Sequence, residues 1–221
     1  DYQGKTLSHT SIPTQADQGP ETGVKNICRA AELALQKSDV TLADIQMIGL
    51  ATPGTMDLKA GMLLDPPNLP GWNDFPIRQR VREHFDKPTI LQNDANAAAY
   101  GEYWIGAGRD ANSLVFWTLG TGIGCGIIIN HMIIEGEHSH GAECGHIVIQ
   151  MDDGRPCDTG QTGTLEAYAG GKSLVRRVEE QLVAGRRSSL SRLIEDGTSL
   201  SPLLIGQACE EGDELAEEMV M

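Results

Sequence analysis

One carboxylate stands where a predicted strand passes directly into a predicted helix. Asp94 follows an apolar segment, Thr89–Gln92, that we predict to be a strand, and it begins an alanine-rich helix predicted to run to Tyr103. In open α/β sheets, ligands bind beyond the carboxyl ends of the strands. A carboxylate there can accept a hydroxyl proton, and Asn93 beside it offers both a donor and an acceptor to neighbouring hydroxyl groups. The alternative interpretation is that Asp94 only caps the helix.

A glycine-rich segment lies between two further apolar stretches, Ser113–Leu119 and Cys125–Asn130, which we predict to be strands. Its residues of interest are Gly120, Thr121, Gly122 and Gly124. Successive backbone amides in such a turn can bind an anion, and glycine allows positive φ angles and the close approach of a ligand. The segment is not a dinucleotide fingerprint, because a strand follows it, and it is not a Walker loop, because it contains no Gly-Lys-Ser/Thr. The alternative is an ordinary glycine-rich hairpin.

A third group of polar residues comes later in the chain, and its members are Glu143, His146 and Glu166. These side chains supply acceptors that suit a ligand with many hydroxyl groups. Three more potential metal ligands lie nearby in the sequence, namely His138, His140 and Cys157. A structural zinc site needs about four ligands, and this region has no Cys-x-Cys or Cys-x-x-Cys pair. A metal site is therefore the weaker interpretation.

Two rigid loops offer further polar groups. Thr52-Pro53-Gly54 follows the predicted strand Ile45–Leu50, and Asn68 lies in the run Pro-Pro-Asn-Leu-Pro-Gly-Trp, which cannot form regular structure. The Asn68 side chain can hydrogen-bond a hydroxyl group of a ligand. Plain turns are the alternative for both loops.

The order of the predicted elements indicates the fold class. Strands and helices alternate through the first half of the chain, which predicts an α/β sheet. Three additional strands are predicted at Leu7–Ile12, His131–Ile134 and His146–Gln150, and the chain is predicted to be helical after Gly163. This pattern predicts two α/β lobes, residues 1–108 and residues 109–221.

Composition and charge exclude several classes of function. The 221-residue chain has 40% hydrophobic and 22% charged residues, which is typical of a globular protein, and its formal net charge is −14. Such an acidic chain offers no basic surface for nucleic acid or for an anionic membrane, so we expect neither as a partner. Its five cysteines are irregularly spaced, which favours a reducing compartment, and we expect a cytoplasmic protein without a membrane span.

Taken in order, these segments resemble a known family. They read Thr-Pro-Gly, Pro-Pro-Asn-Leu-Pro-Gly-Trp, Asn-Asp-Ala-Asn-Ala-Ala-Ala-x-Gly-Glu, Leu-Gly-Thr-Gly-Ile-Gly, Gly-Ala-Glu-x-Gly-His and Gly-x-x-Gly-x-Leu-Glu. The combination closely resembles the ROK family of repressors and kinases, and within it the bacterial glucokinases. The resemblance covers nearly the whole chain and weakens toward its end.

The resemblance implies the actin-like (ribonuclease H-like), two-lobed α/β fold of sugar kinases. It also implies the ATP-dependent phosphorylation of a hexose, glucose to glucose 6-phosphate, with Asp94 as general base. The phosphate-binding residues would be Gly120, Thr121, Gly122 and Gly124, and the sugar-binding residues would be Asn68, Asn93, Glu143, His146 and Glu166. Phosphoryl transfer depends on positioning and charge neutralisation, and Mg²⁺ would complete the latter beside ATP.

Three features depart from the family's pattern. Of the three cysteines in the zinc motif Cys-x-Cys-Gly-x-x-Gly-Cys-x-Glu only Cys157 is kept, because threonine stands at Thr159 and Thr164. With His146, two ligands remain, so we predict no structural zinc. The family's Asp-x-Gly-Gly-Thr phosphate loop near the start and its adenosine-binding Gly-Gly motif near the end are missing from this sequence. We therefore expect a fragment that is incomplete at both ends and inactive by itself.

Other functions within the family stay open at this point. A sugar-responsive transcriptional repressor shares the sugar-binding lobes, although the intact Asp94 and the intact glycine-rich segment favour catalysis. N-acetylhexosamine or fructose could replace glucose as substrate, and polyphosphate could replace ATP. Dimers are common in the family, and no residue here decides whether this chain forms a homodimer.

Overall fold

The computed structural model describes residues 1–66 and 69–221, and it shows an α/β protein with two compact units. The first unit comprises Asp1–Phe116 and Gly126–Ala142, and the second comprises Trp117–Cys125 and Glu143–Met221. Each unit therefore consists of two separate segments of the chain. The division into lobes 1–108 and 109–221 stays a prediction.

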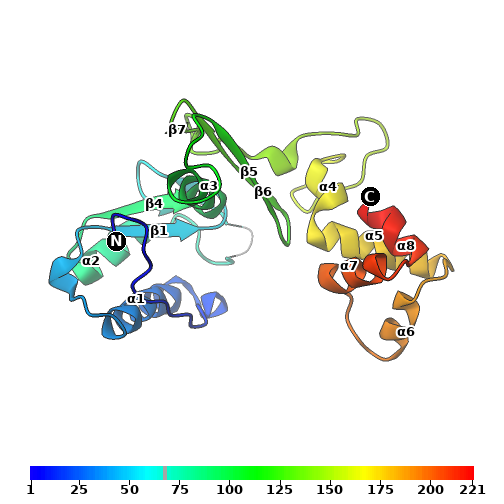
Figure 1. The fold of residues 1–221 in the computed structure, drawn as a ribbon, viewed down its shortest axis with the longest axis horizontal. Coiled ribbons are helices and arrows are strands. Elements are labelled where there is room, and N and C mark those ends of the chain that lie inside the picture. Colours follow the sequence, from blue (N-terminus) through cyan, green and yellow to red (C-terminus); the bar gives the residue numbers. More distant parts are fainter. Residues whose placement is uncertain (67–68) are drawn as a thin grey trace. The chain divides into compact units, whose positions relative to one another are not determined.

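A two-stranded parallel sheet lies at the centre of the first unit (Figure 1). Strand β1 (Ile48–Thr52) pairs with strand β4 (Thr89–Asn93) along the full length of both strands. Between them the chain passes through the short antiparallel pair β2 (Met56–Asp57) and β3 (Met62–Leu63) and then through helix α2 (Ile77–Phe85). Parallel strands need a crossover of this kind, and it confirms the predicted alternation of strands and helices.

The core of the first unit is enclosed by α2 and by helix α1 (Pro20–Gln36). Apolar residues recur every three or four positions along both helices, so each presents one apolar face. Trp72 fills this core, where its ring packs edge-on against Phe75 and its Nε1 donates to the Ala16 carbonyl oxygen at 3.2 Å. The other buried members are Val24, Cys28, Met56, Leu63, Ile77, Val81, Phe85 and Leu91.

A three-stranded sheet has the order β5–β6–β7, formed by Leu114–Leu119, Ile123–Ile129 and Met132–Ile133. Helix α3 (Asp94–Trp104) follows β4 directly and approaches β6 closely. A Cβ atom on Gly126 would lie 2.4 Å from the Cβ atom of Ala99, so only glycine at this position of β6 leaves room for the helix. This contact fixes the helix that begins at Asp94.

The second unit is largely helical, as predicted for the chain after Gly163. Its helices are α4 (Leu165–Ala169), α5 (Gly171–Val183), α6 (Leu190–Glu195), α7 (Pro202–Glu210) and α8 (Glu214–Val220). Their buried core consists of Val178, Leu190, Ile205, Ala208, Leu215 and Ala216. Among the described residues, 1–66 and 69–221, no helix is both long enough and apolar enough to cross a membrane.

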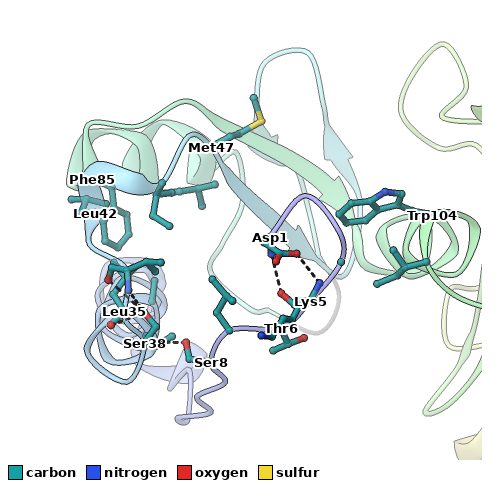
Figure 2. Close-up of a pocket in the computed structure, with 18 residues that line it drawn as sticks. Asp1, Lys5, Thr6, Ser8, Leu35, Ser38, Leu42, Met47, Phe85 and Trp104 are labelled. Atoms are coloured by element: carbon teal, nitrogen blue, oxygen red, sulfur yellow. Dashed lines mark hydrogen bonds between the residues drawn. The ribbon is translucent and has the colours of Figure 1, made fainter.

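Two predicted strands are wrong. Leu7–Ile12 has no regular structure, because this segment lies along α1, where Ser8 Oγ donates to the Ala34 carbonyl oxygen at 2.7 Å. Figure 2 shows Ser8 lining an apolar groove on this side of α1. His146–Gln150 also fails to form a strand, because it pairs only through an isolated bridge between Val148 and Thr164.

Asp213 ties helix α8 to the segment before α6. Its Oδ1 accepts from Ala216 N–H at 3.0 Å and caps α8, while its Oδ2 accepts from Ser189 N–H at 2.6 Å and from Ser188 Oγ at 2.9 Å. Burial by itself raises the pKa of Asp213, but these hydrogen bonds outweigh it and hold the pKa below its usual range. The ionised carboxylate therefore stabilises the fold.

We predict that Asp213→Ala lowers the free energy of unfolding by about 1–2 kcal/mol, because two backbone amides lose their acceptor. Asp213→Asn keeps an acceptor oxygen and should lose less. Because the pKa is lower in the folded state, the wild-type advantage over Asp213→Asn should persist above the unfolded-state pKa and disappear as the pH falls through the folded-state pKa. Urea denaturation of the intact protein at several pH values measures both effects, and an unchanged stability in Asp213→Ala would contradict this account.

Candidate active site

Asp94 is the first residue of α3, and Asn93 ends β4 and caps the helix. The Asn93 Oδ1 accepts from Ala95 N–H at 2.9 Å and from Asn96 N–H at 3.2 Å. The Asp94 Oδ1 also accepts from Ala95 N–H, at 2.9 Å, and the Asp94 side chain is exposed. Asn93 therefore caps the helix, which was the alternative role considered for Asp94. The Asp94 carboxylate is held in place at the helix N-terminus, where negative charge is favoured.

Gln92 stabilises this junction through its side chain, and it was not among the site residues expected from the sequence. Its Oε1 accepts from Asn93 N–H at 2.8 Å and from the buried Asn96 Nδ2 at 3.3 Å, and its Nε2 donates to Glu135 Oε1 at 2.7 Å. The only signal in the sequence is the position of Gln92 next to Asn93. Its partner Glu135 is far away along the chain and could not be predicted.

The glycine-rich segment connects β5 to β6 and is anchored on α5. Gly171 N–H donates to the Gly120 carbonyl oxygen at 2.9 Å, and Lys172 N–H donates to the Thr121 carbonyl oxygen at 3.1 Å. None of the glycines at 120, 122 and 124 has a φ angle in the left-handed region. Glycine is therefore needed at position 122 for space rather than for positive φ.

The space at Gly122 is taken by the carboxylate of Glu166. Glu166 Oε2 accepts from Ile123 N–H at 2.7 Å, and a Cβ atom on Gly122 would lie 2.2 Å from that oxygen. Glu166 Oε1 lies 3.7 Å from the Cys157 thiol, within range of a weak hydrogen bond. Glu166 thus joins the start of α4, the glycine-rich segment and the loop that contains Cys157.

Glu143 precedes a short 3₁₀ helix, Cys144–His146, and His146 is the last residue of this helix. His146 Nε2 lies 4.0 Å from Glu143 Oε2, and Nδ1 of the same ring is buried without a hydrogen-bond partner among the described residues. The turn rests on β6, because a Cβ atom on Gly145 would lie 2.3 Å from the Ile123 carbonyl oxygen. Glu143, His146 and Glu166 are therefore all attached to the beginning of β6.

The cysteine beside this turn, Cys125, is not suited to nucleophilic chemistry at neutral pH. Burial raises the pKa of Cys125 to about 12, and a hydrogen bond with the Cys144 thiol and the negative charge of Glu143 add to the increase. A thiol with so high a pKa stays protonated at neutral pH.

Of the residues predicted to act together, Asn93 and Asp94 belong to the first unit. Those in the second unit are Gly120, Thr121, Gly122, Gly124, Glu143, His146 and Glu166. Asn68 lies outside the described residues. Within each unit the predicted residues are linked by hydrogen bonds or close backbone contacts. A single site that combines the residues of both units stays a prediction. An apolar groove in the first unit (Figure 2) includes none of the predicted site residues in its described lining.

We predict that Gly122→Ala displaces the Glu166 carboxylate from Ile123 N–H, because the new methyl group would occupy the place of Oε2. Hydrogen exchange of the peptide that spans β6 should then be faster. Gly120→Ala is the matched control, since a Cβ atom there meets nothing within 4 Å and the φ angle suits alanine. Equal exchange in the two variants would show that the contact between Gly122 and Glu166 does not hold the segment.

The whole chain, residues 1–221, matches the ROK family. It is 35% identical over 188 residues to a glucokinase of Halalkalibacterium halodurans, which covers 85% of this chain and 57% of that protein. It is 31% identical over 193 residues to a xylose repressor of Caldicellulosiruptor bescii, which covers 86% of this chain and 47% of that protein. The chain thus spans less than two thirds of the length of either relative.

The chain is also similar to a solved structure of a ROK family protein. The crystal structure of a ROK family glucokinase from Streptomyces griseus in complex with glucose and AMPPNP superimposes with a TM-score of 0.79 at 32% identity, over 99% of this chain and 68% of that one. This confirms the α/β, actin-like fold of the ROK sugar kinases. Since the family match extends along the full length of the chain, the chain belongs to the ROK family.

Proposed function

We propose that the intact protein transfers the terminal phosphate of ATP to a hexose and converts glucose to glucose 6-phosphate, with Asp94 as the general base. The observation that carries this proposal is the exposed Asp94 carboxylate, which is anchored by Ala95 N–H while Asn93 takes over the capping of the helix. The similarity to glucokinases supports the class of reaction.

In this reaction the sugar hydroxyl oxygen attacks the γ-phosphorus of ATP while the bond to the bridging oxygen breaks and ADP leaves. The hydroxyl proton passes to the Asp94 carboxylate. The transition state is loose, so positioning contributes more than covalent assistance. When bound, Mg²⁺ neutralises phosphate charge. It typically uses one or two carboxylates together with phosphate oxygens.

The hydrogen bonds in each unit refine the proposed roles of the sugar-binding residues. The Asn93 Oδ1 is occupied by backbone amides, so we assign its Nδ2 to donate to a sugar hydroxyl. Glu166 Oε2 is occupied by Ile123 N–H, so we assign its Oε1 to accept from a sugar hydroxyl. Glu143 and His146 complete the proposed set, with Asn68 as a further contact.

Existing hydrogen bonds also indicate which amides of the glycine-rich segment can donate to a phosphate group. The amides of Gly120, Ile123 and Gly124 already donate to Gly122 O, Glu166 Oε2 and Thr118 Oγ1. We therefore assign phosphate binding to the amides of Thr121 and Gly122 and to the Thr121 hydroxyl group. A chain with net charge −14 needs such local donors to hold a polyanion.

A sugar-responsive repressor is the second candidate function, and the similarity to a xylose repressor favours it. Both functions use a sugar site, but only the kinase needs a base beside the reacting hydroxyl group. Turnover of ATP in the presence of sugar, measured on the intact protein, separates the two. We also propose a cytoplasmic location, which rests on the cysteine pattern.

We predict that Asp94→Asn lowers kcat by about 10²–10⁴-fold, because the amide cannot accept the proton. Asn93 still caps the helix in this variant, and the new amide oxygen at position 94 can still accept from Ala95 N–H, so the Kd for glucose should change less than about twofold. A coupled assay of ADP release and titration calorimetry with glucose measure the two quantities in the intact protein. Unchanged turnover would rule out Asp94 as the base.

The identity of the sugar needs a separate experiment. We predict that among glucose, fructose, N-acetylglucosamine and N-acetylmannosamine, glucose gives the highest kcat/KM with ATP. Polyphosphate should be tested as an alternative donor under the same conditions. A higher kcat/KM for an N-acetylated sugar would retain the kinase assignment but would replace its substrate.

A further inference from the structure

Residues 150–163 form a loop that leads into α4 and is closed by its own backbone. Cys157 N–H donates to the Gln161 carbonyl oxygen at 2.8 Å, and Gly160 N–H donates to the Cys157 carbonyl oxygen at 3.0 Å. At the base of the loop, Gly163 N–H donates to the Arg155 carbonyl oxygen at 2.8 Å. In the family pattern this segment carries the cysteines that bind zinc, and here it carries one.

The donor set of this loop does not fit zinc. Thr164 is fully buried, and its Oγ1 accepts from Ala167 N–H at 3.3 Å, so this hydroxyl group is occupied in capping α4. Thr159 is exposed, and a neutral hydroxyl group is a poor substitute for a thiolate. Within residues 1–66 and 69–221, no three His, Cys, Asp or Glu side chains gather where they could hold a metal ion.

Two arginines bind the loop to the helices of the same unit. Arg155 Nη2 donates to both carboxylate oxygens of Glu180 on α5, at 2.6 and 2.5 Å. Arg176, also on α5, reaches back to the loop, where its Nη2 donates to the Pro156 carbonyl oxygen at 3.1 Å and its Nη1 lies 3.5 Å from Asp158 Oδ1. We call Arg155, Arg176, Glu180 and Asp158 the arginine clamp.

A contact to α4 and a charge effect reinforce the arginine clamp. Arg155 N–H donates to the Tyr168 hydroxyl oxygen at 3.1 Å, which ties the same residue to α4. The hydrogen bond from Arg155, with smaller contributions from the charges of Arg155, Arg176 and Arg177, holds the pKa of Glu180 below its usual range. Exposed ion pairs contribute little to global stability, so the effect of the clamp should be local to the loop.

The clamped loop ends against a residue of the proposed sugar site. Cys157 is buried, and its thiol lies 3.7 Å from Glu166 Oε1, the oxygen that we assign to the sugar. The other oxygen of Glu166 is held by Ile123 N–H. A shift of the loop would therefore displace the Glu166 carboxylate.

We propose that the arginine clamp takes the place of the structural zinc in this chain, and that Arg155 and Glu180 are positioning residues that hold the Cys157 loop against Glu166. The part that concerns the loop and the metal is independent of the proposed function. The part that concerns Glu166 rests on the proposed function, because it assigns that residue to the sugar.

The metal content of the intact protein tests the first part. Protein purified without chelator should contain less than about 0.1 zinc ion per chain, and EDTA should change neither hydrogen exchange in residues 150–163 nor glucose affinity. One zinc ion per chain, with a loop that loosens when the ion is removed, would overturn the replacement of zinc by the clamp.

Two variants that remove either side of the ion pair test the clamp itself. Arg155→Gln and Glu180→Gln should each accelerate hydrogen exchange in residues 150–163 by about tenfold, with the melting temperature within about 2 °C of wild type. The double variant should exchange no faster in this loop than either single variant, because each single variant already breaks the ion pair. Glu218→Gln, which breaks the exposed Arg186–Glu218 pair elsewhere in the unit, is the matched control and should leave the loop unchanged.

The kinetic constants distinguish positioning from a purely structural role. In both loop variants the KM for glucose should rise about fivefold to tenfold while kcat stays within about twofold, because only binding of the sugar is weakened. A loop that stays protected in both variants would overturn the clamp, and a loosened loop with an unchanged KM for glucose would overturn the positioning of Glu166. If the wild-type protein phosphorylates no sugar, the proposed function fails while the zinc and exchange measurements still decide the clamp.

Discussion

The first turn of α3 imposes the constraint on which the proposed active site depends. A helix begins with backbone amides that have no partner inside the helix, and they must find acceptors. The Asn93 Oδ1 takes two of them, and its position is fixed by Gln92. Because Asn93 caps the helix, Asp94 is left as an exposed carboxylate at the helix N-terminus and at the carboxyl end of β4, where α/β sheets bind ligands.

In the second unit, the carboxylate of Glu166 is held in place in a similar way. One oxygen of Glu166 accepts from Ile123 N–H, and the missing side chain of Gly122 makes room for it. Asp94 likewise has one oxygen on Ala95 N–H. In both cases a backbone amide fixes the direction of the side chain while the second oxygen is assigned to a ligand. The arginine clamp extends this arrangement by supporting Glu166 from the side of Cys157.

Patterns that are local in the sequence predict the fold and the positions of the candidate residues. The apolar run before Asp94 and the alanines after it are sufficient to predict the junction of β4 and α3. The Leu7–Ile12 strand fails because an apolar run does not reveal whether it will pair with a strand or lie along a helix, as Ser8 does on α1. Contacts between distant segments, such as Gln92 with Glu135 or Arg155 with Glu180, depend on the tertiary fold and leave no local signal.

In the proposed reaction, Asp94 receives the proton of the sugar hydroxyl group that is phosphorylated. The most direct test is a crystal structure of the intact protein with glucose and a non-hydrolysable ATP analogue. We expect an Asp94 carboxylate oxygen to lie about 2.6–3.2 Å from the glucose 6-hydroxyl oxygen, which is the reach of a general base. A bound glucose whose 6-hydroxyl oxygen contacts a different base, with Asp94 turned away from the sugar, would contradict it.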